Sequence, residues 1–347
     1  MEEKKKIAMV TGAGQDSSYL TEMLLKKGYK VVTLIRRTSY PNTQRLEHLR
    51  FLEESDDDSF TMDYFDLSDS VSIHNAIKKY TPDVIFNMAA QSHVGISFKV
   101  PESTIDFNML GPLRILEAIK EINPKIKFYQ ASSSEMFGIS PPPQSESTPF
   151  MPCSPYGVAK LGAYHLVRAY REGYGLHASN GILFNHESER RGLNFVTRKI
   201  TNNIAEIIAG KRKKITLGNL DAKRDWGHSK DYMRAIIEIM ESDKPMDVVI
   251  STGEAYSIKD FLKESFELIG LNWEDYVVIN DKFKRPFDVP ALLGDNAKAM
   301  QTLKWRPEIK FKELVREMLE NDLKEIAGLN IEQTRQKINS MKRTQSE

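Results

Sequence analysis

The sequence is poor in cysteine and has no long hydrophobic segment. Its one cysteine, Cys153, excludes an intrachain disulfide and a cysteine metal cluster, and we expect no metal site. A membrane-spanning helix needs about 18 consecutive apolar residues, and no such run occurs. The N-terminus, residues 1–6, is charged and runs directly into an apolar strand pattern, which leaves no room for a secretory signal. We therefore expect a cytoplasmic protein.

The chain also lacks an excess of charge of either sign. It carries 49 Lys and Arg against 48 Asp and Glu, a formal net charge of +1. This balance offers no general attraction for nucleic acid or an anionic membrane, so we expect neither as a partner. Any anionic ligand must be held by local basic groups. With 347 residues, 40% of them hydrophobic, the chain can form one large or two medium domains.

The N-terminal part follows the pattern of a strand, a glycine-rich turn, an amphipathic helix and a second strand. Gly12 can supply the tight bend and Gly14 the close backbone approach to a pyrophosphate, while Gln15 and Asp16 lie at the helix start, whose amides bind anions. Ser17 stands where a third glycine is usual, so an ordinary tight turn is the alternative. The pattern predicts a dinucleotide-binding βαβ unit.

The residues after the second strand indicate which dinucleotide is bound. An NAD site usually has an acidic residue there for the ribose hydroxyls, whereas this chain has Arg36 and Arg37. A guanidinium can bind a ribose phosphate through paired, charge-assisted hydrogen bonds. We expect NADP, with NAD possible because the argument concerns one phosphate, and with a solvated basic turn as the alternative role.

Two further predicted strands end in residues that suit a cofactor. Asp66, followed by Leu67, could accept a hydrogen bond from an adenine amino group. Ala89 and Ala90 could let a dinucleotide pass close to the backbone. Either pair could equally serve loop and packing roles.

Tyr156 and Lys160 form the pair with the clearest chemistry. Residues four apart share a helix face, so the ammonium can lie near the phenol and favour its ionised form. A free phenol titrates near pH ~10 and would otherwise accept a proton poorly at neutral pH. The pair indicates oxidation of an alcohol, although a solvated pair on a helix surface is the common alternative.

Strand and helix patterns alternate as far as residue 185, which is typical of a doubly wound parallel sheet. We expect an α/β fold with a Rossmann domain over residues 1–185, to which segments near 225–255 return. Helices, isolated strands and two basic runs follow, and they predict a smaller C-terminal α+β substrate domain over residues 186–330. The end, residues 331–347, is rich in Lys, Arg and Gln and is expected to fray.

Ordered motifs occur along nearly the whole chain. They are AQSHV at 90–94, FYQASSSE at 128–135, TPF at 148–150, SPYG at 154–157, GILFNHES at 181–188, NFVTRKI at 194–200 and GNLDAKRDWGH at 218–228. In these motifs the chain resembles the extended short-chain dehydrogenase/reductases, and within them the GDP-mannose 4,6-dehydratases. That group includes enzymes that act on a GDP-linked manno-heptose.

The resemblance implies four catalytic roles. Tyr156 takes the proton from the sugar 4-hydroxyl while hydride leaves carbon 4, and Lys160 supports the phenolate and the nicotinamide ribose. Glu135 removes the proton on carbon 5 and passes a proton to the departing 6-hydroxyl, before hydride returns to carbon 6. Ser133 stands where the family usually has threonine and would hydrogen-bond the 4-oxygen. A related epimerase needs no such carboxylate, so Glu135 is the discriminating residue.

The resemblance also implies how the GDP-sugar is held. The implied substrate-binding residues are Ser92, Asn185, Lys199, Arg224, Arg285 and Asp288. The cations among them would balance the diphosphate. Gly95 provides no side chain just after the AQSHV motif, so a smaller residue near the pocket could admit a larger sugar. A homo-oligomer, commonly a tetramer, is implied as well, with the loop over residues 36–43 beside a neighbouring subunit.

We therefore predict a GDP-mannose-type 4,6-dehydratase that retains NADP(H) through its cycle. Its substrate would be GDP-D-mannose or GDP-D-glycero-D-manno-heptose, and its product the GDP-4-keto-6-deoxy sugar. The sequence leaves the choice between hexose and heptose open. The alternatives are a nucleotide-sugar 4-epimerase, which would release no water, and a non-catalytic NADP-binding sensor, which should lack a competent Tyr156 and Lys160 pair.

Overall fold

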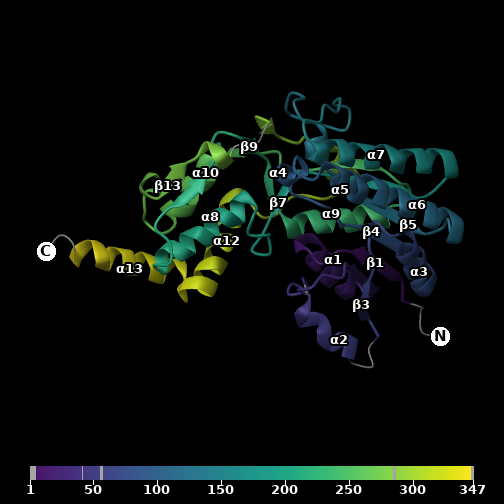
Figure 1. The fold of residues 1–347 in the computed structure, drawn as a ribbon, viewed down its shortest axis with the longest axis horizontal. Helices are drawn as coiled ribbons and strands as arrows, with labels where there is room; N and C mark the ends of the chain where they lie inside the picture. The colour runs from purple at the N-terminus through teal and green to yellow at the C-terminus, as the bar shows by residue number, and fades with distance from the viewer. Residues whose placement is uncertain (1–4, 41, 55–57, 284–286, 345–347) are drawn as a thin grey trace.

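The larger of two lobes is built on a seven-stranded sheet, and the smaller lobe carries the C-terminus (Figure 1). This computed structural model describes residues 5–40, 42–54, 58–283 and 287–344. The sheet has the order β11-β6-β5-β4-β1-β2-β3, and every neighbouring pair is parallel. Its strands are β1 (Ile7–Thr11), β2 (Lys30–Ile35), β3 (Phe60–Tyr64), β4 (Val84–Asn87), β5 (Lys127–Ser133), β6 (Ala178–Leu183) and β11 (Asp247–Ile250). The predicted doubly wound α/β fold is confirmed.

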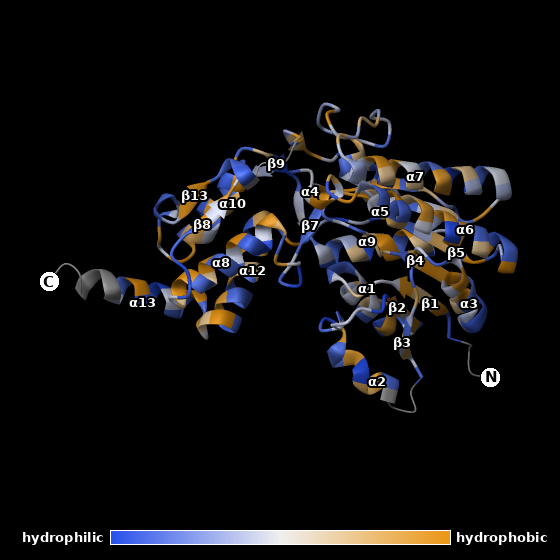
Figure 2. Cartoon of the chain, in the orientation of Figure 1, coloured by the Kyte–Doolittle hydropathy of each residue, from blue (hydrophilic) through white to orange (hydrophobic). Residues whose placement is uncertain are grey.

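Helices cover both faces of this sheet. One face carries α1 (Gln15–Lys26) and α9 (Ser229–Glu241), and the other carries α3 (Ser70–Tyr80), α6 (Gly111–Ile122) and α7 (Pro155–Tyr174). The strands are therefore buried on both sides, which explains their continuous apolar runs. Figure 2 shows apolar residues gathered in the sheet and on the inner faces of these helices. The chain returns to this lobe through α9 and β11.

Shorter elements complete the larger lobe. They are η1 (Glu47–Leu49), α2 (Arg50–Glu54), α4 (Val94–Ser97), α5 (Pro101–Ile105), the π-helical η2 (Asp106–Leu110), η3 (Ser134–Met136) and α11 (Ala297–Thr302). Within the described ranges, no helix is both long and apolar enough to cross a membrane.

The smaller lobe has a core of its own, in which Trp226, Phe261 and Phe311 lie together. Its helices are α8 (Val196–Ile208), α10 (Ile258–Glu267), α12 (Phe311–Ala327) and the one-turn η4 (Trp273–Asp275) and η5 (Asp281–Phe283). Its small sheets pair β8 (Ile215–Leu217) with β13 (Val277–Ile279), and β9 (Lys223–Arg224) with β12 (Tyr256–Ser257) and β14 (Ala291–Leu292). Between the lobes, β7 (Asn185–Glu187) pairs with β10 (Trp226–His228).

The C-terminal segment corrects the expectation of a frayed tail. Helix α13 (Ile331–Thr344) continues from the smaller lobe, and Ile331 and Ile338 are buried in that lobe's core. These isoleucines are seven residues apart and so lie on one helix face. The Lys337 ammonium donates to the Ile208 carbonyl at the end of α8. The polar composition misled because two apolar residues at helical spacing are enough to dock the helix.

A buried ion pair joins α8 to α12. The Nε of Arg198 donates to both oxygens of Asp322, at 2.8 and 2.9 Å, and the Thr201 hydroxyl donates to the same carboxylate at 2.6 Å. Only 9% of the Arg198 side chain and none of the Asp322 side chain is exposed. Burial raises the pKa of Asp322, and the two donors oppose that shift.

We expect Asp322→Ala to destabilise the protein by about 3–5 kcal/mol, because the Arg198 charge would stay buried with only the exposed Glu325 carboxylate, at 3.5 Å, as an acidic partner. Urea unfolding followed by circular dichroism measures the change. Thr201→Val is the matched control, since it removes one hydrogen bond to the same carboxylate and should cost about 1 kcal/mol. Wild-type stability of Asp322→Ala would contradict the importance of this pair.

Candidate active site

Two adjoining pockets lie at the carboxyl ends of the parallel strands, where open α/β sheets bind ligands. The glycine-turn pocket, of about 960 Å³, lies against the turn after β1 and the ends of β2, β3 and β4. The interlobe pocket, of about 750 Å³, reaches from the start of α7 to the smaller lobe. The two share Asp16, Met88, Ala90, Ser92, Arg191 and Phe195. One extended ligand or two adjacent ligands can therefore occupy them together.

The turn between β1 and α1 has the geometry of an anion site. Gly12 has φ of +86°, a conformation that favours glycine, and a side chain there would touch Ala89. Gly14 precedes α1, and no side chain caps the first amides of that helix. The Ser17 hydroxyl donates to the Thr11 carbonyl at 3.1 Å, which shows how serine fits where a third glycine is usual. The uncapped amides are free to bind a pyrophosphate.

A chain of side-chain hydrogen bonds connects the strand ends beneath both pockets. The Thr11 hydroxyl donates to Asn87 at 2.9 Å and accepts from the amides of Met88 and Ala89 at 3.0 and 2.9 Å. The Asn87 amide then donates to Gln130 at 2.8 Å. Because all three polar side chains are buried, this chain holds β1, β4 and β5 in one alignment.

Arg36 and Arg37 both line the glycine-turn pocket. The Arg36 guanidinium lies 5.5 Å from the centre of the Phe107 ring, and that of Arg37 lies 5.8 Å from the centre of the Tyr64 ring. Aromatic rings therefore support both cations at the edge of the pocket.

The remaining residues predicted for the cofactor also line this pocket. Asp66 accepts from both the amide and the hydroxyl of Ser68, at 2.8 and 2.6 Å, so part of its capacity is used in its own turn. Leu67, Ala89 and Ala90 supply apolar walls.

The start of α7 places the predicted catalytic residues. The Ser154 hydroxyl accepts from the Gly157 amide at 3.0 Å and so caps the helix, which sets Tyr156 in its first turn and Lys160 one turn later. At Gly157, an added methyl carbon would lie 2.7 Å from the Glu135 carbonyl oxygen. The glycine therefore lets the turn that carries Glu135 pack directly against α7.

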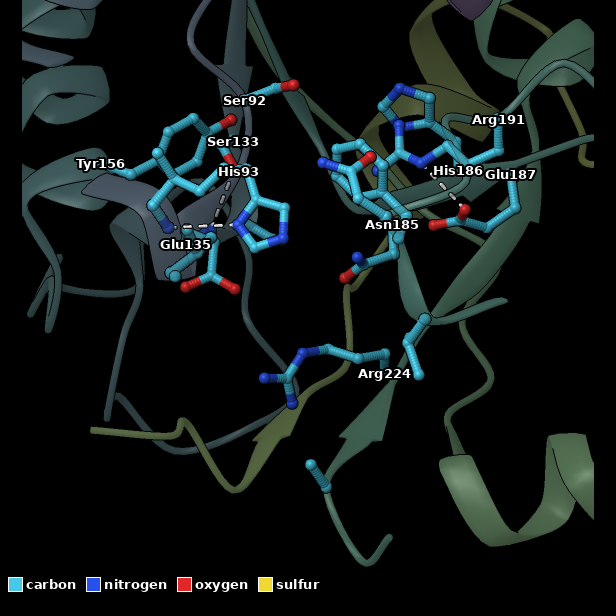
Figure 3. Close-up of a pocket in the computed structure, with 18 of the residues that line it drawn as sticks. Ser92, His93, Ser133, Glu135, Tyr156, Asn185, His186, Glu187, Arg191 and Arg224 are labelled. Atoms are coloured by element: carbon cyan, nitrogen blue, oxygen red, sulfur yellow. Dashed lines mark hydrogen bonds and ion pairs between the residues drawn. The ribbon is translucent and has the colours of Figure 1, made fainter. Parts of the chain in front are cut away.

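The four predicted catalytic side chains line the interlobe pocket together. Figure 3 shows Tyr156, Ser133 and Glu135 on one side of it. The Ser133 hydroxyl accepts from the Glu135 amide at 3.2 Å, which fixes the turn between them. The arrangement brings together a phenol, a hydroxyl, a carboxyl group and an amine.

The pKa values of Tyr156 and Lys160 differ from the expectation that the lysine favours an ionised phenol. Burial raises the pKa of Tyr156 to about 12, although a hydrogen bond with Ser133 acts in the other direction. Burial also lowers the pKa of Lys160 to about 8. The Lys160 amine lies 5.8 Å from the Tyr156 ring centre and donates to the Ala131 carbonyl at 2.8 Å. Burial is therefore the larger influence on the Tyr156 phenol, and the spacing of the tyrosine and the lysine does not by itself keep the phenol ionised.

The residues predicted for the substrate lie on the walls of the interlobe pocket. Those that line it are Ser92, Asn185, Lys199, Arg224 and Asp288. The Arg224 guanidinium donates to the Val289 carbonyl at 2.8 Å and lies 3.4 Å from an Asp288 oxygen. The Lys199 ammonium donates to the Thr216 carbonyl at 2.7 Å, and burial lowers its pKa. Arg285 lies outside the described residues.

The sequence reasoning missed His186, which lies across the pocket from Tyr156 (Figure 3). Its Nε2 lies 2.9 Å from the Asp16 carboxylate and its Nδ1 lies 2.7 Å from the Phe184 carbonyl. Two acceptors require two ring protons, so the ring is an imidazolium. Burial by itself would lower the pKa of His186, but Asp16 raises it. Burial would likewise raise the pKa of Asp16, yet His186 holds it well below its usual range.

Arg191 is the second residue that was missed, and it lines both pockets. Its guanidinium stacks 3.7 Å from the centre of the Phe195 ring, and its Nε lies 3.0 Å from Glu187. The sequence signal for it was the charged run that directly follows the GILFNHES motif.

Glu189, His228 and Glu317 bring their side-chain ligand atoms within 4.8 Å of one another. The Nδ1 of His228 accepts from the Lys230 amide at 3.0 Å, so its Nε2 carries the proton and lacks a lone pair for a metal. Lys230 also pairs with Glu317 at 3.0 Å. Glu317 is therefore held by the Lys230 ion pair, and Glu189 accepts from the Tyr19 hydroxyl.

Comparison with known proteins identifies the family. The family model described as GDP-mannose 4,6 dehydratase matches residues 9–318. The chain belongs to this family. GDP-mannose 4,6 dehydratase 1 of Arabidopsis thaliana is 49% identical over 326 residues, which cover 92% of this chain and 90% of that protein. The human GDP-mannose 4,6 dehydratase is 46% identical and covers 93% of both chains. That of Vibrio cholerae is 46% identical and covers 92% of this chain and 94% of its own.

Solved structures support the fold of this family member. A UDP-glucose 4-epimerase with UDP-glucose from Thermotoga maritima has a TM-score of 0.80 at 22% identity, over 93% of this chain and 100% of that one. A dTDP-glucose 4,6-dehydratase with NAD from Bacillus anthracis has a TM-score of 0.78 at 22% identity, over 91% and 96%. At these identities the likeness shows the fold alone.

The depressed pKa of Lys160 predicts a pH dependence of stability. The folded protein releases this proton near pH 8, whereas the unfolded chain keeps it to about 10.5. The unfolded state then binds more protons in this window, so Lys160 makes stability rise with pH from about 8 to 10.5. We expect Lys160→Met to flatten this rise in urea unfolding. Lys78→Met, at an exposed position on α3, controls for the loss of a lysine, and an unchanged rise in Lys160→Met would contradict the prediction.

Proposed function

We propose that the protein is a GDP-mannose-type 4,6-dehydratase, which converts a GDP-manno-configured sugar to the GDP-4-keto-6-deoxy sugar. The observation that carries this proposal is the position of Glu135 in one pocket with Ser133, Tyr156 and Lys160. A carboxyl group beside a redox base supplies the additional acid/base group that loss of water requires. Family membership supports the same reaction.

In the proposed mechanism, Tyr156 acts as its phenolate and takes the proton of the sugar 4-hydroxyl, while Ser133 hydrogen-bonds the 4-oxygen. A nicotinamide dinucleotide, when bound in the glycine-turn pocket, would supply the hydride chemistry, taking hydride from carbon 4 and giving it back at carbon 6. The resulting 4-ketone acidifies carbon 5, from which the Glu135 carboxylate takes the proton. The same group then delivers a proton to the departing 6-hydroxyl, so one water leaves. When carbon 6 has received hydride, carbon 5 regains a proton, for which the proton held by Tyr156 is available, and the phenolate is restored. Lys160, whose amine lies 5.8 Å from the Tyr156 ring centre, would support the phenolate and the nicotinamide ribose.

The dinucleotide is proposed to be NADP, held by the glycine-turn pocket. The open space at Gly14 and the uncapped amides of α1 fit a pyrophosphate. Arg36 and Arg37, on the wall of the same pocket, support the choice of NADP through their fit to a ribose phosphate. NAD is the alternative. The names of the relatives mention neither dinucleotide.

The GDP-sugar is proposed to occupy the interlobe pocket. Lys199 and Arg224 would balance its diphosphate, with Ser92, Asn185 and Asp288 as polar contacts. GDP-mannose and the GDP-linked manno-heptose are both candidate substrates. Gly95 supports the larger sugar, because it lines the pocket without a side chain. Similarity to GDP-mannose enzymes along the chain supports the hexose.

A homo-oligomer is proposed from the resemblance, with the loop after β2 at the interface. Tyr40 on this loop leaves 76% of its surface exposed, which supports a contact with a neighbouring subunit. A cytoplasmic location stays a prediction from the sequence.

The function is tested by incubating purified protein with GDP-mannose and, separately, with GDP-manno-heptose, without added reductant. Mass spectrometry should show loss of one water from a substrate, and the faster substrate distinguishes hexose from heptose. We expect Glu135→Gln to lose about 10²–10⁴-fold of this activity while it still binds NADP, because the acid/base group is absent. Glu146→Gln is the control, a glutamate whose carboxylate bonds the Val249 amide. Normal turnover by Glu135→Gln, or a 4-epimer of unchanged mass, would reject the proposal.

The cofactor preference has its own test. We expect Arg36→Glu combined with Arg37→Ala to weaken NADP binding by about 10–100-fold and to leave NAD binding within a few-fold, because only the ribose phosphate loses its partners. Calorimetric titration with each dinucleotide measures both constants. The same charge change at Lys26→Glu with Lys27→Ala, on the far end of α1, is the matched control. Equal losses for the two dinucleotides would show that the arginines do not read the phosphate.

A further inference from the structure

One face of α1 binds a segment of the chain that lies about 170 positions later in the sequence. The residues of this face are Gln15, Asp16, Ser18, Tyr19 and Glu22, whose spacing places them side by side on a helix. Each of them contacts a residue of the segment 186–190. The helix that begins at the glycine turn is thus also the support of this segment.

Arg190 makes the densest of these contacts. Its guanidinium lies 4.0 Å from the centre of the Tyr19 ring, and it donates to Glu22 at 2.6 Å and to the Ser18 hydroxyl at 3.0 Å. Tyr19 is buried, and 23% of the Arg190 side chain is exposed. A stacked and doubly hydrogen-bonded arginine has one orientation, which lysine cannot reproduce.

The backbone on both sides of Arg190 is also fixed. The Tyr19 hydroxyl donates to Glu189 at 2.6 Å, and the Arg45 guanidinium donates to the Arg190 carbonyl at 2.6 Å. The Ser188 hydroxyl donates to Gln15 at 2.7 Å and accepts from the Arg190 amide at 3.0 Å. The segment therefore leaves α1 in a defined direction.

The next residue, Arg191, lines both pockets. Its guanidinium is stacked on Phe195, while its Nε is buried near Glu187 without a well-formed hydrogen bond. Arg190 itself lines neither pocket. The two neighbouring arginines therefore face different partners: Arg190 binds protein and Arg191 faces the ligand space.

We propose that Arg190 is a positioning residue for ligand binding, which acts by fixing Arg191 at the junction of the two pockets. There the Arg191 guanidinium meets anionic groups of nucleotide ligands in either pocket. The contacts of Arg190 with α1 hold this cation in place before a ligand arrives, so ligand binding does not have to order it. The inference rests on the proposed function for the nature of the ligands.

A double-mutant cycle tests the proposal. Calorimetry gives the Kd of NADP and of GDP for wild type, Arg190→Met, Arg191→Met and the double variant. We expect Arg190→Met to raise both constants about 10-fold, and to have no further effect once Arg191 is replaced, because Arg190 acts through Arg191. Arg190→Lys should fall between wild type and Arg190→Met.

Arg234→Met is the matched control, since Arg234 also carries two ion pairs, to Asp231 and Glu308, but lines neither pocket. It should leave both Kd values unchanged and should combine additively with Arg191→Met. A merely structural Arg190 would lower the thermal midpoint without a change in either Kd, and that result overturns the proposal. The proposal is also overturned if the fold-changes in Kd caused by Arg190→Met and by Arg191→Met multiply in the double variant. Wild-type protein that binds neither ligand would instead reject the proposed function, and this inference with it.

Discussion

The hydrogen-bonded chain from Thr11 through Asn87 to Gln130 is the constraint on which both pockets depend. A buried polar group that loses its partner costs about 1–3 kcal/mol, so none of these side chains can move alone. The chain ties together the ends of β1, β4 and β5, which lead to the glycine turn, to Ala89 and to Ser133. The interior of the sheet thereby holds in place the strand ends from which both pockets are built.

Burial sets the proton states of the catalytic pair. Tyr156 and Lys160 are both shifted toward their neutral forms, since neither charge is solvated. In the proposed reaction, the ligands must therefore bring the charges that make the phenol a base. The ion pair of Asp16 and His186 differs from the catalytic pair, because each of its two charges has the opposite charge beside it.

Local patterns predicted the fold better than they predicted the proton states and the interlobe contacts. The glycine turn, the parallel strands and the Tyr156 and Lys160 spacing are signals within a few residues of one another. The shift of the Tyr156 pKa depends on everything that covers it, which no spacing reveals. His186 was missed because its partner, Asp16, lies 170 positions away. Arg191 was missed because the two pockets that it lines are formed by segments far apart in the sequence. The docking of α13 through Ile331 and Ile338 was hidden by a composition dominated by polar residues.

The contact between Gly157 and the turn that carries Glu135 involves backbone and not the catalytic side chain. Gly157 faces the backbone carbonyl of Glu135, and the glutamate side chain takes no part in that contact. The residue at position 135 can therefore be exchanged without disturbing the packing that presents it to the pocket. A side chain at position 157, by contrast, would displace the turn itself, and with it every group that the turn presents to the pocket.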